Sequence, residues 1–216
     1  LKEIGKFCNN FKINNALIVT DNGSVNLPFI SDLQNLLNDS KVKSAIYSNI
    51  SPNPRDDEID SGCKKFRDGN HDAIIAIGGG SAMDGGKAIS LTVNSGVSLW
   101  DFEFEKEPPK LEMENPFPKI ITIPTTAGTG AETEVTAMVT HLEKGMKFCL
   151  WHPDARPCLA LVDPELTLKL PANLTAWTGI DAMIHAIEGY SVPMFHPLCD
   201  GSAIESLNLI SKSLYA

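Results

Sequence analysis

The chain has 216 residues, of which 43% are hydrophobic and 21% are charged, and its formal net charge is −9. This is enough apolar material for one large domain or two small ones with a real core. The acidic balance argues against a nucleic acid or an anionic membrane as the partner, because those surfaces require clustered lysines and arginines. No stretch approaches the roughly 20 apolar residues of a membrane span, and no signal-peptide pattern opens the chain.

The cysteines are five in number, widely separated, and include no C-x-x-C pair. This pattern predicts reduced thiols in a cytoplasmic protein, rather than a disulfide framework or a structural zinc site. The chain does not begin with methionine, and a helix-like segment comes before any strand. We therefore expect a truncated start.

Apolar runs that alternate with helical patterns predict an α/β fold with a parallel sheet. The predicted strands are 16–20, 44–47, 72–77, 119–124 and 159–162. The predicted helices between them are 29–38, 56–69 and 84–92. Residues 135–140 and 146–150 are strand-like and could pair with each other across a polar turn. Residues 103–118 are rich in Glu, Lys and Pro and should form a surface excursion.

The pattern changes at Leu170-Pro171, after which every segment looks helical. One apolar stripe at helical spacing comprises Trp177, Ile180, Ile184 and Ile187. The sequence therefore predicts an α/β domain over 1–163 and the beginning of an all-helical domain over 164–216.

A glycine-rich stretch, Gly78–Lys87, leaves the carboxyl end of a buried predicted strand and opens a helix; we call it the glycine turn. Glycines let a backbone approach a phosphate closely, and a helix N-terminus supplies N–H groups and the positive end of a dipole. Open α/β sheets bind ligands at this edge. The dinucleotide fingerprint would need glycine at Met83, and a Walker A loop would need glycine at Ser81 and Ser or Thr at Ala88. Phosphate binding is favoured over a purely structural strand-to-helix turn, which the pattern also allows.

Asp181 and His185 are four residues apart in a predicted helix, so their side chains share a face and can converge on one cation. A satisfied polar pair beside an apolar stripe is the plainer interpretation. His196 is the one later histidine; it precedes Pro197, which can begin a helix, and we expect it to be structural or to line a cleft. We expect no metal ligand among the earlier histidines His71, His141 and His152.

Three motifs, in this order, resemble signatures of the iron-containing (group III) alcohol dehydrogenase family: Gly78–Lys87, Ile123–Gly130 and Gly179–Glu188. The resemblance extends over essentially the whole chain. It implies that 1–163 is an NAD-binding α/β domain and that 164–216 begins an all-helical metal-binding domain. It also implies truncation at both ends, without the family's opening strand and with the remaining metal ligands beyond Ala216.

The resemblance also implies a set of cofactor contacts. The pyrophosphate would bind to Gly79, Gly80 and Ser81. The adenine and nicotinamide side of the cleft would be lined by Thr125, Thr126 and Thr129. Further cofactor contacts would come from Asn53, Lys147 and Leu166. Asp21, just past the first predicted strand, resembles the acidic residue that binds the adenosine ribose. A carboxylate there would repel a 2′-phosphate, which favours NAD over NADP. A turn-capping aspartate is the plainer interpretation of Asp21.

In the family one divalent metal is held by four side chains, and Asp181 and His185 match the first two. They would also be the catalytic residues, because the metal acts as a Lewis acid on the alcohol while hydride passes to the nicotinamide. Iron(II) suits such ligands, and zinc stays open. Asp84 could orient the cofactor or substrate, or could cap the following helix.

The implied function is a metal-dependent, NAD-dependent alcohol dehydrogenase, which in reverse reduces an aldehyde or ketone. The expected partner is a small-molecule alcohol or aldehyde, without nucleic acid or membrane, and a homo-oligomer stays open. Alternatives of the same fold are a hydroxyacid–oxoacid transhydrogenase, a polyol dehydrogenase and a dehydroquinate-synthase-like lyase, whose motifs differ from the Ile123–Gly130 stretch. The non-enzyme alternative is a catalytically incomplete nucleotide-binding fragment. The sequence does not define which alcohol is used.

Overall fold

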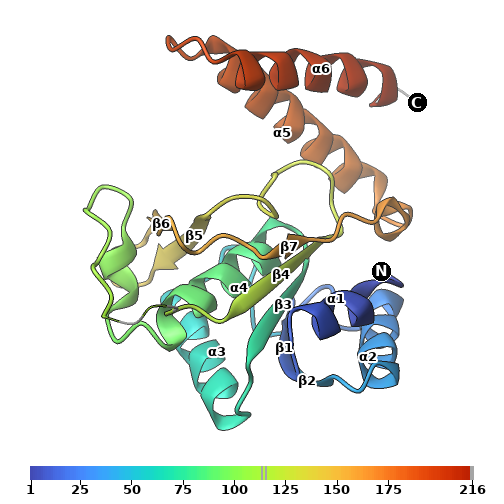
Figure 1. Cartoon of the computed structure of the whole chain (residues 1–216). Coiled ribbons are helices and arrows are strands. Elements are labelled where there is room, and N and C mark those ends of the chain that lie inside the picture. The colour runs from blue at the N-terminus through green and yellow to red at the C-terminus, as the bar shows by residue number, and fades with distance from the viewer. Residues whose placement is uncertain (113, 115, 215–216) are drawn as a thin grey trace. The chain divides into compact units, whose positions relative to one another are not determined.

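The computed structural model describes residues 1–112, 114 and 116–214. The chain divides into two compact units (Figure 1). The first unit comprises Leu1–Pro124 and Ala131–Asp163, and the second comprises Thr125–Gly130 and Pro164–Ala216. The short segment Thr125–Gly130, here called the threonine segment, therefore interrupts the first unit in sequence and belongs to the second. No linear reading of the sequence predicted this interruption.

A parallel sheet of five strands, in the order β2-β1-β3-β4-β7, forms the centre of the first unit. In chain order the strands are β1 (Asn15–Val19), β2 (Lys43–Tyr47), β3 (Ala73–Gly78), β4 (Lys119–Pro124) and β7 (Leu159–Ala160). All five predicted strands are confirmed, although β7 is shorter than expected. Every residue of β3 is buried, as expected for a parallel strand that is covered on both faces. Gly78 pairs with Pro124, so β3 and β4 end side by side.

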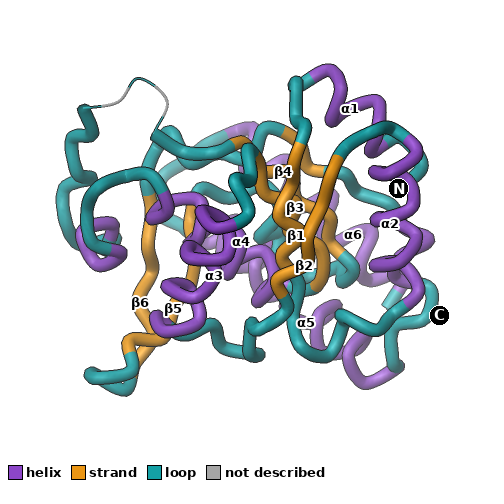
Figure 2. The backbone as a smooth tube through the Cα atoms, turned by 90° about the horizontal axis from the view of Figure 1, so that it is seen from below, coloured by secondary structure: helices purple, strands orange, loops and turns teal. Residues whose placement is uncertain are grey.

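Four helices cover this sheet: α1 (Ile4–Asn10), α2 (Pro28–Asp39), α3 (Asp56–Asp68) and α4 (Gly80–Val93). Figure 2 shows α1 and α2 on one side of the strands and α3 and α4 on the other. This is the arrangement that right-handed crossover connections produce for this strand order. A core cluster joins alternate residues of β1 and β3, such as Leu17 and Ile74, to buried residues of α3 and α4, such as Ile59 and Ile89.

The sequence prediction placed the start of α4 too late. The helix begins at Gly80 rather than near Asp84, with Gly79 as its N-cap in an extended conformation. Glycine has a low helix propensity, which argued against a helix over this stretch, but packing on the sheet overrides that weak preference. Because Asp84 lies a full turn inside α4, it does not cap the helix.

A separate antiparallel hairpin is formed by β5 (Thr136–His141) and β6 (Met146–Trp151), as the sequence predicted. Between the strands, Gly145 adopts a positive φ of 64°, which glycine tolerates without a steric penalty. Upstream, a 3₁₀ turn spans Leu99–Phe102. In the described part of 103–118, no helix forms before β4 begins, and Glu103 makes one isolated bridge to Leu150. Positions 113 and 115 of that predicted excursion lie outside the described residues.

The second unit is helical from Pro164 onward, as predicted from the change of pattern. It contains a 3₁₀ turn (Pro164–Thr167), α5 (Ala172–Ser191) and α6 (Pro197–Ser213), and the two long helices pack against each other. The predicted apolar stripe of α5 is solvent-exposed, from 43% at Ile187 to 64% at Trp177. Among the described helices, none combines the length and apolar character needed to cross a bilayer.

Candidate functional site

The glycine turn lies at the carboxyl end of β3 and at the start of α4. Gly78 has a φ of +146°, and a Cβ on this residue would lie 2.7 Å from Ala82 Cβ and 2.9 Å from Asp21 Oδ2. Both the backbone conformation and the space therefore require glycine. Gly79 and Gly80 follow as the N-cap and first residue of α4. A helix end of this kind presents unpaired N–H groups that can bind a phosphate.

Asp21 stabilises the turn that follows β1. Its Oδ1 accepts hydrogen bonds from the backbone N–H groups of Gly23 and Ser24, both at 2.9 Å, and its Oδ2 accepts one from Ser24 Oγ at 2.8 Å. The contacts expected of a turn-capping aspartate are thus present. A carboxylate has about four lone-pair sites, so these bonds leave acceptor capacity for a ribose hydroxyl.

The loop Pro52–Pro54 is held by the glycine turn and by the hairpin. Ser81 Oγ donates a hydrogen bond to the Pro52 carbonyl at 2.7 Å. The backbone N–H of Thr140, the register partner of Lys147, donates to the Pro54 carbonyl at 2.7 Å. The structure therefore brings Ser81, exposed Asn53 and the strand that carries Lys147 to one place in the first unit. The role of the two proline carbonyls was missed, because backbone acceptors leave no sequence signal.

The threonine segment packs on α5 within the second unit. Thr125 is buried, and Thr126 and Thr129 are half-buried. A Cβ on Gly128 would lie 2.4 Å from the carbonyl oxygen of Thr178 and 2.7 Å from its Cβ. Only glycine allows two backbones to approach so closely. Leu166, half-buried in the 3₁₀ turn before α5, belongs to the same unit.

Asp181 and His185 point toward each other on α5, one turn beyond Thr178. Nε2 of His185 lies 3.7 Å from Oδ2 of Asp181, and the side chains are 54% and 45% exposed, respectively. This distance is too long for a hydrogen bond, so the pair is not satisfied by itself. Two ligands of one tetrahedral metal, each at about 2.1 Å, lie about 3.4 Å apart, so the spacing suits a shared cation. Among the described residues, no group of three or more His, Cys, Asp and Glu side chains is gathered where it could hold a metal.

Three of the other histidines make contacts within the fold. His196 caps α6, where its Nδ1 accepts a hydrogen bond from the Cys199 N–H at 3.4 Å. His71 Nδ1 lies 3.0 Å from Asn15 Oδ1, and His141 stacks on Trp100 with ring centroids 4.3 Å apart.

One further pair was missed from the sequence. Lys87 was named only as the last residue of the glycine turn, but its side chain is 1% exposed and its Nζ lies 3.4 Å from Asp84 Oδ1. Burial raises the pKa of Asp84, and the nearby Lys87 charge partly offsets this. The signal was the spacing of three residues, which places two side chains on one helix face.

A parallel sheet with a phosphate-binding type of turn at its carboxyl edge, followed by a helical unit, defines a nucleotide-binding α/β protein with an added helical part. The chain belongs to the iron-containing alcohol dehydrogenase family. The family model for iron-containing alcohol dehydrogenase matches residues 1–164, and the model for the C-terminal part of the Fe-containing alcohol dehydrogenase family matches residues 175–216.

Relatives of known name match nearly the whole chain. Alcohol dehydrogenase 4 of Saccharomyces cerevisiae is 33% identical over 216 residues, which are 100% of this chain and 55% of that protein. An NAD-dependent methanol dehydrogenase of Bacillus methanolicus is 34% identical over 214 residues, 99% of this chain and 55% of that protein. A crystal structure of 1,3-propanediol oxidoreductase superposes with a TM-score of 0.92 at 31% identity, covering 99% of this chain and 55% of that one. The chain thus spans about half the length of the relatives it matches.

Proposed function

We propose that this chain provides the NAD-binding domain, residues 1–163, and the beginning of the metal-binding helical domain, residues 164–216, of an alcohol dehydrogenase. The reaction is hydride transfer from a small alcohol to NAD, with aldehyde or ketone reduction in reverse. Family membership supports this proposal, as do the relatives that are named for methanol and for 1,3-propanediol. The observation that carries it is the convergence of Asp181 and His185, because a nucleotide-binding module without catalysis has no need of two apposed ligands.

The cofactor role rests on the first unit. Gly79, Gly80 and Ser81 at the start of α4 would bind the pyrophosphate through backbone N–H groups and the helix dipole. Asn53 lies in the loop that is bonded to Ser81, and Lys147 lies on the strand paired with the one that is bonded to the same loop; both would contact the remainder of the dinucleotide. Asp21 would accept from the adenosine ribose and disfavour the 2′-phosphate of NADP. In the second unit, Thr125, Thr126, Thr129 and Leu166 are the proposed contacts.

The metal role rests on Asp181 and His185. A divalent cation held there would act as a Lewis acid that makes the alcohol easier to deprotonate. The carboxylate and imidazole suit iron(II), in keeping with the family name, and zinc is the alternative. The proposed location is the cytoplasm, in keeping with five free cysteines. A homo-oligomer, a hydroxyacid–oxoacid transhydrogenase and a polyol dehydrogenase remain alternatives to be tested.

The test combines NADH binding, metal uptake and alcohol-dependent reduction of NAD by the 216-residue chain. His185→Ala should leave the NADH affinity unchanged while abolishing metal uptake and NAD reduction. The matched control is His196→Ala, which removes a helix cap but no proposed ligand. Turnover that survives His185→Ala would contradict the metal assignment. NADH binding without metal uptake or turnover in the unaltered chain would instead favour the catalytically incomplete nucleotide-binding fragment.

A further inference from the structure

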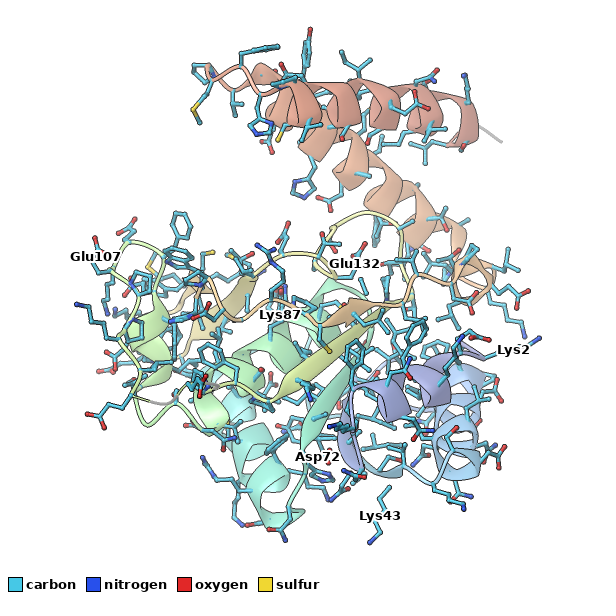
Figure 3. All side chains as sticks on the ribbon, in the orientation of Figure 1. Lys2, Lys43, Asp72, Lys87, Glu107 and Glu132 are labelled. Carbon is cyan, nitrogen blue, oxygen red and sulfur yellow. The ribbon has the colours of Figure 1, made fainter. Side chains whose placement is uncertain are left out.

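Lys87 is a charged side chain enclosed within the first unit. It is among the largest fully buried side chains of the described residues, at 1% exposure, whereas Lys2 and Lys43 extend into solvent (Figure 3). Its Nζ donates a hydrogen bond to the Ala131 carbonyl at 2.9 Å and lies 3.4 Å from Asp84 Oδ1. An ammonium group is costly to bury unless it is paired and hydrogen-bonded. Because both of these contacts are internal, Lys87 does not offer its charge to a phosphate at the surface.

Asp84 links the same pair to the hairpin. Burial raises the pKa of the Asp84 carboxyl, and the Lys87 charge and the backbone of Met138 in β5 oppose this effect. Helix α4 also packs directly on β5. The pair on one turn of α4 therefore holds the chain at Ala131, and it lies on the helix that packs against β5 within the first unit.

Thr122 on β4 provides an independent anchor beside Lys87. Its hydroxyl donates to the Glu132 carbonyl at 2.8 Å and lies 3.3 Å from the Leu159 carbonyl oxygen. Consecutive carbonyls, those of Ala131 and Glu132, therefore receive side-chain hydrogen bonds from α4 and from β4. Figure 3 labels Lys87 and Glu132 in this region.

These anchored residues directly follow the threonine segment. Ala131 comes immediately after Gly130, and the other end of the segment leaves Pro124, which is fixed by its pairing with Gly78. Downstream, Met138 leads through β5 to the strand that carries Lys147. The pair on α4 thus fixes the chain between two groups of proposed cofactor contacts.

We propose that Lys87 and Asp84 are positioning residues for the dinucleotide: by fixing Ala131, they set where the threonine segment ends and where the chain that leads to the hairpin begins. They need not touch the cofactor themselves. The identification of the ligand as a dinucleotide rests on the proposed function. The restraint on the chain at Ala131 rests only on the contacts of Lys87 and Asp84.

The first test uses the variant Asp84→Asn/Lys87→Met, which removes both charges together and leaves no unpaired buried carboxylate. Amide hydrogen exchange over residues 125–132 is measured without ligand, with the core strands β1 and β3 as internal references. Loss of a hydrogen bond from a charged donor predicts exchange over 125–132 that is about tenfold faster or more. A titration with NADH should show an affinity that is weaker by a similar factor.

The second test uses Thr122→Val, which keeps the shape of the side chain and removes only the hydroxyl anchor. Exchange over 125–132 and the dissociation constant for NADH should both rise several-fold. The matched control is Thr92→Val, whose hydroxyl bonds to the Ala88 carbonyl at 2.8 Å within α4, and both readouts should stay at the level of the unaltered chain. This variant keeps the proposal testable if the charge-removing variant does not fold.

The outcomes separate the two proposals. Unchanged exchange over 125–132 in the double variant and in Thr122→Val would overturn the positioning role. Faster exchange with an unchanged affinity for NADH would overturn it as well, because the restraint on the chain would then not affect cofactor binding. Failure of the unaltered chain to bind NADH would instead count against the proposed function. Faster exchange together with weaker NADH binding, in both variants and not in Thr92→Val, supports the role of the pair.

Discussion

Gly128 and Thr178 meet backbone to backbone: a Cβ on residue 128 would lie 2.4 Å from the Thr178 carbonyl oxygen. Thr178 is one turn before Asp181 on α5, so the contact connects the threonine segment to the helix that carries the proposed metal ligands. Gly128 is therefore required by packing within the second unit, independently of any cofactor.

Gly128→Ala should destabilise the second unit by about 1–3 kcal/mol, because the new methyl group can be accommodated only if a backbone moves. The measurement is the free energy of unfolding in urea. Gly189→Ala is the control, since this glycine also lies in α5 but has open space around its Cβ position. That variant should gain up to about 1 kcal/mol from better helix propensity. Equal stability of Gly128→Ala and the unaltered chain would contradict the close approach.

Gly78→Ala should cost about 1–3 kcal/mol, because residue 78 combines a φ of +146° with contacts of 2.7 and 2.9 Å to a new Cβ. The new methyl group would also displace Asp21 and so weaken NADH binding. Both effects can be followed, by urea unfolding and by NADH fluorescence. Gly201→Ala in α6, with nothing within 4 Å, provides the control. A variant Gly78→Ala that unfolds and binds NADH like the unaltered chain would refute the argument.

His71 should make the fold less stable in mild acid. Burial lowers its pKa from the ordinary value, and in the described structure its Nε2 is buried without a hydrogen-bond partner. The unfolded chain therefore takes up a proton more readily than the folded chain. Stability begins to fall as the pH drops below the ordinary histidine pKa of about 6.5 and continues to fall until the lowered pKa of the folded state is passed.

The measurement is the difference in free energy of unfolding between about pH 7.5 and about pH 5, the two sides of that window. His71→Gln should reduce this difference, while His196→Gln, at an exposed helix cap, should leave it nearly unchanged. An identical pH dependence in all three proteins would exclude a role for His71.

The cysteines should react with a maleimide in an order set by their burial. Burial raises the pKa of Cys8 to about 11 and that of Cys63 to about 12, and the thiolate is the reactive form. Cys199 on α6 and Cys158 are both exposed, but burial of the thiol raises the pKa of Cys158, so Cys199 should react first. At about pH 8, Cys199 should be labelled rapidly, and Cys8 and Cys63 only after unfolding. Mass spectrometry identifies the labelled peptides, and Cys199→Ser should remove the rapid phase. Early labelling of Cys63 would contradict its place in the core.

The strands and most helices could be predicted because their signals are local. A continuous apolar run such as 119–124 predicts a parallel strand that is covered on both faces. Acidic residues in the first turn of α3 indicate where that helix begins. The start of α4 could not be placed in this way. Its glycines argue against a helix locally, and only the packing of α4 on β3 and β4 decides the matter.

The candidate site was predictable where a motif supplies side chains and not where it supplies backbone. The closeness of Asp181 and His185 follows from helical spacing, and their separation of 3.7 Å agrees with it. The carbonyls of Pro52, Pro54 and Ala131 carry no sequence mark, although they hold the loop, the hairpin and Lys87. Burial of Lys87 was equally hidden, because a lysine in a helix is normally a solvent-exposed residue.

The threonine segment also sets how this protein could be divided. Because Thr125–Gly130 belongs to the helical unit yet lies within the sequence of the sheet unit, a single cut after Asp163 cannot separate the two units. The shortened chain would retain Gly128 but lose the helix backbone on which it packs. Exchange of helical parts between members of the family therefore needs three junctions, at 124/125, 130/131 and 163/164, with the six-residue segment transferred together with its helix.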